Sequence, residues 1–158
     1  MKNLRLFKSL IEILFFLHVL GLFAIVLWFP LGIFDGANTE QLHWWEWIIL
    51  TLYCIIYLIF LRGLFFLRKT ARKLLQNKIF TKYVAYSTQI SGFHFIIAGI
   101  LLLLINLSEI FFQIYFESLP KSFLITSVFL IMIGLFFIIQ SEILLKAIDI
   151  KDENDMTV

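Results

Sequence analysis

Six ionisable side chains interrupt the long apolar runs of this sequence, and they could carry out chemistry within a membrane. They are Glu12, His18, Arg62, His94, Glu109 and Glu142. An ionisable group inside an apolar span is costly to bury, so each is a functional candidate by default. Carboxylates, imidazoles and a guanidinium in one layer could form a structural ion-pair lock, relay protons or take part in catalysis.

Depth along the spans favours one grouping of these side chains. Glu12 lies about one turn into the first span. Arg62 and Glu142 lie about one turn from the ends of the second and fourth, and His94 lies somewhat deeper in the third. Because charges in a low dielectric need partners, we predict a polar intramembrane cluster centred on Arg62. The alternatives are that these groups snorkel to the headgroups, or that they form a proton pathway.

Catalytic and metal-binding motifs are absent from the sequence. It contains no H-E-x-x-H, G-x-S-x-G or Walker pattern. The three histidines and Cys54 lack the spacing of metal ligands. Ser91 and His94, at i and i+3, come nearest to a nucleophile with its base, and this arrangement is more often packing. The sequence therefore predicts a protein that is not an enzyme and has no metal or cofactor.

The apolar runs themselves predict the elements that position these residues. The chain has 158 residues, of which 61% are hydrophobic and 15% charged, whereas soluble domains average about 45–50% and about 25%. A membrane-spanning helix needs about 20 residues. We therefore predict an all-α polytopic membrane protein, a single four-helix transmembrane bundle with spans at about 9–29, 44–67, 83–112 and 122–145. No signal-peptide cleavage site follows the first run, so it is expected to be an uncleaved span.

Positive charge is distributed unevenly between the predicted loops. All Lys and Arg residues except Lys121, and except Arg62 near the end of the second span, lie near the N-terminus, in the 68–82 loop or in the 146–158 tail. The positive-inside rule then places both termini in the cytoplasm.

Small residues repeat every seven positions in the last two spans. The repeats are Ala85, Gly92, Gly99 and Asn106 in one span, and Ser127, Gly134 and Ser141 in the other. Seven residues is close to two helical turns, so each set forms one stripe. Since small residues allow helices to approach closely in lipid, these spans are predicted to pack antiparallel along the stripes. Chance is the alternative explanation.

The basic loop and the acidic tail have two interpretations. The basic residues of the loop, Arg68, Lys69, Arg72 and Lys73 among them, could simply determine topology and contact anionic lipids. They could instead bind an acidic cytoplasmic partner. Attraction between opposite charges could also fold the tail back on the loop.

Three short motifs resemble those of a known family. Leu74–Thr81 resembles a Gly/Asn-x-Pro-Phe-Thr turn, with Ile79 where that turn often has Pro. Ser141–Ile143 resembles an Ala-Glu-Ile pattern, and Asp152–Val158 resembles a Glu-Glu-Asn-Asp-Leu-Thr-Val ending. These motifs are similar to those of an uncharacterised family, a domain of unknown function, of small bacterial four-span membrane proteins. The resemblance covers essentially the whole chain.

The resemblance implies a multi-pass protein of the bacterial cytoplasmic (inner) membrane with no established activity. Members of the family are often encoded beside a small Cro-type helix-turn-helix regulator, which implies that the loop or tail could hold a regulator at the membrane. The resemblance also draws attention to Glu142 and to the tail residues Asn154–Val158.

The leading functional hypothesis is therefore a non-enzymatic membrane protein that contacts lipids and binds a cytoplasmic protein, with no direct contact to nucleic acid. The binding residues would be those of the loop and the tail: Arg68, Lys69, Arg72, Lys73, Asn154, Asp155 and Thr157. The alternative is a small transporter or channel component that acts as a homo-oligomer and uses the intramembrane charges as its pathway. A lipid-modifying enzyme is a third hypothesis.

Overall fold

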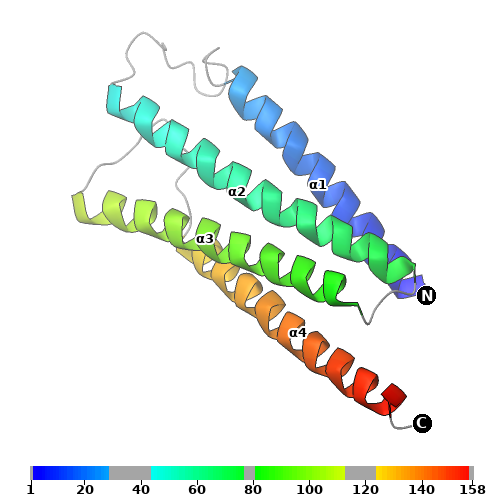
Figure 1. The fold of residues 1–158 in the computed structure, drawn as a ribbon. Helices are drawn as coiled ribbons and strands as arrows, with labels where there is room; N and C mark the ends of the chain where they lie inside the picture. Colours follow the sequence, from blue (N-terminus) through cyan, green and yellow to red (C-terminus); the bar gives the residue numbers. More distant parts are fainter. Residues whose placement is uncertain (1, 29–43, 77–80, 113–123, 157–158) are drawn as a thin grey trace.

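Four long helices make up the part of the chain that the computed structural model describes, residues 2–28, 44–76, 81–112 and 124–156. They are α1 (Lys2–Trp28), α2 (Trp44–Leu75), α3 (Lys82–Phe112) and α4 (Leu124–Met156) (Figure 1). Each is long and apolar enough to cross a membrane, and the described residues contain no strand. The predicted fold class, an all-α protein with four membrane-spanning helices, is confirmed.

α2 and α4 extend well beyond the length that a bilayer requires, into charged sequence. α2 has 32 residues and α4 has 33, whereas about 20 residues suffice to cross the hydrocarbon. The extra turns lie at their C-terminal ends, where the sequence becomes charged. α2 continues through the basic residues to Leu75, and α4 continues through most of the predicted tail to Met156.

The helices pack in chain order, and each is antiparallel to the next. α1 packs against α2, α2 against α3, and α3 against α4; within the described ranges, α1 and α4 make no contact with each other. The bundle is therefore open. Figure 1 shows both chain termini at the same end of the molecule, where α2 also ends and α3 begins. We call this the basic end.

The hydrophobic core centres on α2 and α3, and it includes Ile11 of α1. Phe95 of α3 is 2% exposed, and its ring centroid lies 5.5 Å from that of Phe60 on α2 and 5.8 Å from that of Phe137 on α4. Ser91, one turn before Phe95, donates a 2.8 Å hydrogen bond to the Gly63 carbonyl of α2. α3 is thus the central helix, and it contacts two neighbours through different faces.

The seven-residue stripes of α3 and α4 meet directly. A Cβ atom added to Gly92 would lie 2.7 Å from the Gly134 carbonyl oxygen, and one added to Gly99 would lie 2.9 Å from that of Ser127. The Ser141 hydroxyl donates a 2.8 Å hydrogen bond to the Ala85 carbonyl. The structure thus pairs the residues that the sequence assigned to this contact, because only small side chains let two backbones come this close.

Most large apolar side chains lie on the outside of the helices. In lipid this placement is expected, because hydrocarbon chains are as apolar as leucine and give no hydrophobic drive between helices. Hydrogen bonds and close packing must therefore hold the helices together.

Candidate functional site

Glu12 is the centre of an ion-pair cluster at the basic end of α1 and α2. Its Oε1 atom accepts hydrogen bonds from Arg72 Nε at 3.2 Å and Nη2 at 3.1 Å. Arg68 Nε lies 3.8 Å from the same oxygen, and Lys8 Nζ lies 4.0 Å away. One carboxylate therefore faces three cations, and its side chain is 27% exposed. We call Lys8, Glu12, Arg68 and Arg72 the Glu12 cluster.

Arg68 is the most enclosed cation of the Glu12 cluster. Its side chain is 18% exposed, and its guanidinium carbon lies 5.1 Å from the ring centroids of both Phe15 and Phe16. At 3.8 Å, Nε is too far from Glu12 for a hydrogen bond, and this buried atom has no acceptor among the described residues. A buried donor without an acceptor costs free energy, so Arg68 retains unused hydrogen-bonding capacity.

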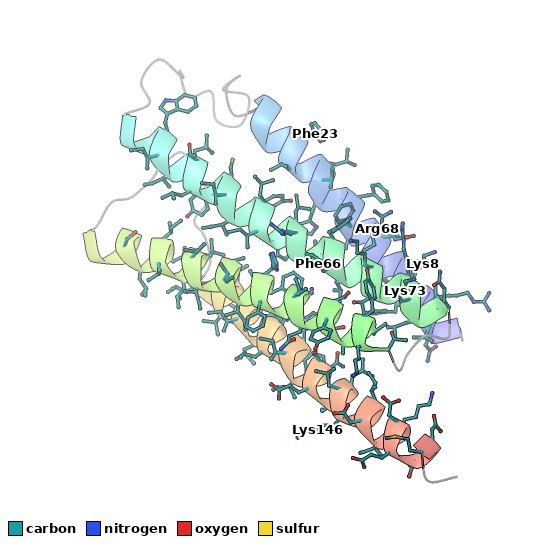
Figure 2. All side chains as sticks on the ribbon, in the orientation of Figure 1. Lys8, Phe23, Phe66, Arg68, Lys73 and Lys146 are labelled. Atoms are coloured by element: carbon teal, nitrogen blue, oxygen red, sulfur yellow. The ribbon has the colours of Figure 1, made fainter. Side chains whose placement is uncertain are left out.

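Aromatic rings also support the neighbouring basic side chains. Lys69 Nζ lies 4.5 Å from the Phe65 ring centroid, and Lys73 Nζ lies 5.8 Å from that of Tyr83. Cation–π attraction orients such ammonium groups. Figure 2 labels Lys8, Arg68 and Lys73 at the same end of the helices. The basic end is thus a set of positioned cations rather than a disordered charged loop.

The structure does not bring the four residues of the predicted intramembrane cluster together. Glu12 pairs with Arg68 and Arg72 in place of Arg62, because Arg62 lies about 120° around α2 from Arg68 at 100° per residue. Glu142 is on α4, which does not touch α1 in the described residues. Arg62 and Glu142 are both exposed, the placement that snorkelling towards the headgroups requires.

The two histidines within the described helices bond to their own backbone. His94 Nδ1 lies 2.7 Å from the Ile90 carbonyl oxygen, and His18 Nδ1 lies 2.7 Å from that of Leu14. The Ser91 hydroxyl is donated to Gly63, so Ser91 and His94 are not a nucleophile and base in contact. The described residues hold no group of three or more His, Cys, Asp or Glu side chains that could bind a metal.

Tyr57 forms a polar contact with α1 that the sequence did not predict. Its hydroxyl donates a 2.9 Å hydrogen bond to the His18 carbonyl oxygen, and its ring stacks on that of His18 with centroids 5.9 Å apart. The signal that could have found it is a tyrosine hydroxyl deep in an apolar run. The contact joins α1 to α2 at a second level, deeper than the Glu12 cluster.

The acidic end of α4 stands apart from the basic end of α2. Residues 149–156, including Asn154 and Asp155, are all exposed, while Thr157 lies outside the described residues. Within the described ranges, α4 packs along α3 and not along α2. The tail up to Met156 therefore does not fold back on Arg68 and Arg72, which face Glu12.

Four apolar antiparallel helices with charged extensions at one end define an integral multi-pass membrane protein. The chain belongs to the family described as a protein of unknown function (DUF2975), whose model matches residues 31–158. This confirms the resemblance drawn from the motifs, and the match includes α2, α3 and α4. No curated protein matches the chain, and no solved structure does.

Proposed function

We propose that this protein is a non-enzymatic component of the bacterial cytoplasmic membrane that binds a cytoplasmic protein through the ends of α2 and α4. The observation that carries the proposal is the acidic, fully exposed extension of α4. In this extension Asp149, Asp152 and Glu153 are spaced i, i+3 and i+4, so they lie on one helical face.

The charge of this extension opposes its own helix. Carboxylates near a helix C-terminus interact unfavourably with the macrodipole, and cations are preferred there. The last turn of α4 nevertheless contains no basic residue. The exposed turns also bury no apolar face against the rest of the chain. A basic partner would supply both the missing positive charge and the missing contact.

The exposed end of α2 adds a second element to the proposed surface. Arg72 is 50% exposed even though it binds Glu12, and Lys73 follows it on the same helix. Arg68, in contrast, lies against α1 and faces Glu12. The class of partner that the resemblance implies, a small helix-turn-helix regulator, carries a basic DNA-binding face, which would be complementary to the acidic face of α4.

Truncation after Ile150 tests this proposal. We expect pull-down from crosslinked cells to lose a protein that the intact chain retains, because the truncation removes Asp152, Glu153 and Asp155. The triple neutralisation Asp149→Asn, Asp152→Asn, Glu153→Gln should lose the same protein while keeping the helix length. Lys146→Gln, on the same helix, serves as the control and should retain it. If both variants still insert into the membrane and retain an unchanged set of proteins, the proposal is wrong.

A further inference from the structure

The Glu12 cluster adjoins a shallow groove on the membrane face of α1. The groove has a volume of about 570 Å³ and is lined by Ser9, Glu12, Ile13, Phe16, Leu17 and Leu20. Two of its residues connect it to the cluster: Glu12 binds Arg72, and the ring of Phe16 lies 5.1 Å from the Arg68 guanidinium carbon. The cationic Glu12 cluster and the apolar groove therefore form one continuous surface.

We propose that this continuous surface binds one anionic phospholipid of the inner leaflet. The phosphate would lie against Arg68, Arg72 and Lys8, and one acyl chain would lie along the groove. The proposal concerns a different part of the molecule from the acidic face of α4, so neither depends on the other.

Charge complementarity is the first argument for an anionic occupant. Three cations surround the single carboxylate of Glu12 within 4.0 Å, which leaves positive charge in excess. Arginine guanidinium groups match the oxygens of a phosphate in a bidentate manner. Arg72 is half-exposed, and the buried Nε of Arg68 has no acceptor among the described residues. Protein groups in the described part of the chain thus leave the cluster incompletely neutralised.

The length of the groove is the second argument. Ser9 to Leu20 covers eleven helical steps, or about 16 Å at 1.5 Å per residue. Half of a hydrocarbon core of about 30 Å is about 15 Å. The groove therefore has the length of one leaflet, and its charged end lies where a headgroup would be. Below Glu12 its lining is apolar, as an acyl chain requires.

Lipid binding to the purified full-length chain in detergent, followed by native mass spectrometry, tests the proposal. Phosphatidylglycerol should bind at least about tenfold more tightly than phosphatidylcholine with identical acyl chains. Anionic-lipid contacts contribute about 1 kcal/mol per basic residue, so Arg68→Gln with Arg72→Gln should weaken phosphatidylglycerol binding about thirtyfold. Arg62→Gln, on the same helix but outside the cluster, is the matched control and should leave it unchanged.

Glu12→Gln distinguishes a lipid site from a merely structural cluster. Removing the one carboxylate frees the guanidinium groups, so phosphatidylglycerol should bind about fivefold more tightly, by the same per-charge contribution. A general loosening of α1 would weaken binding instead. Equal binding of the two lipids, displacement of phosphatidylglycerol by millimolar inorganic phosphate, equal loss in Arg62→Gln, or weaker binding by Glu12→Gln would each overturn the proposal.

Discussion

Replacing Gly134 with alanine should force α3 and α4 apart and lower the free energy of unfolding by about 2–3 kcal/mol, in the range measured for overpacking. The added Cβ would lie 2.7 Å from the Gly92 carbonyl oxygen and 2.9 Å from the backbone nitrogen of Ile96. Neither atom can move unless the helix moves. The adjacent Ser141–Ala85 hydrogen bond would weaken at the same time. Unfolding in mixed micelles of dodecyl sulfate and dodecyl maltoside, followed by far-UV circular dichroism, measures the loss.

Gly21→Ala is the matched control for that prediction. A Cβ atom at Gly21 would meet the Tyr57 hydroxyl at 3.0 Å, and this is the far end of a side chain that can shift. Alanine also favours a helix over glycine by about 1 kcal/mol, so this variant should change stability by less than about 1 kcal/mol. Equal losses from the two variants would show that the close approach of α3 and α4 does not stabilise the fold.

Glu12→Lys should loosen α1 from α2 and lower the free energy of unfolding by about 2 kcal/mol. It replaces an attraction worth up to about 1 kcal/mol with a repulsion of similar size. The effect concerns the whole helix because α1 packs against α2 alone among the described helices. The same mixed-micelle titration measures it.

The charge swap Glu12→Lys with Arg72→Glu should recover at least half of that loss, since an ion pair forms again with reversed sign. Glu12→Lys with Arg62→Glu is the control and should recover little, because Arg62 lies on another face of α2. Equal recovery in both double variants would contradict the geometry of the Glu12 cluster.

The long apolar runs and the seven-residue stripes were sufficient to predict the spans and the α3–α4 contact. An apolar run and a seven-residue stripe can each be recognised in the sequence of a single helix. Gly92 and Gly134 each belong to a regular stripe, and two such stripes have one obvious way to pack in lipid. Outside these stripes, Ser91 of α3 hydrogen-bonds to Gly63 of α2.

The partner of Glu12 could not be predicted in the same way. Depth ranks residues along a helix axis, but it does not say which face points towards the neighbour. Arg62 precedes Arg68 and Arg72 by six and ten residues, about 9 and 15 Å along the helix axis. The rotation of α2 against α1 then turns the last two towards Glu12. That rotation is set by contacts such as the packing of Leu64 and Leu67 in the core with Ile11, which apolar composition alone does not order.

The continuation of α4 to Met156 was missed for a related reason. Acidic residues near a helix C-terminus oppose the macrodipole, so the sequence from Lys146 onward reads as a separate tail. Propagating a helix that already exists requires no new nucleation, and the long span supplies that helix.

Single-cysteine labelling of intact cells tests the threading of the chain most directly. Cys54 is first replaced by serine, and one cysteine is then introduced at Lys121 or at Lys151. A membrane-impermeant maleimide should label the residue-121 cysteine in intact cells and the residue-151 cysteine only after permeabilisation. Labelling at residue 151 in intact cells would contradict a chain that crosses the bilayer four times with both ends in the cytoplasm.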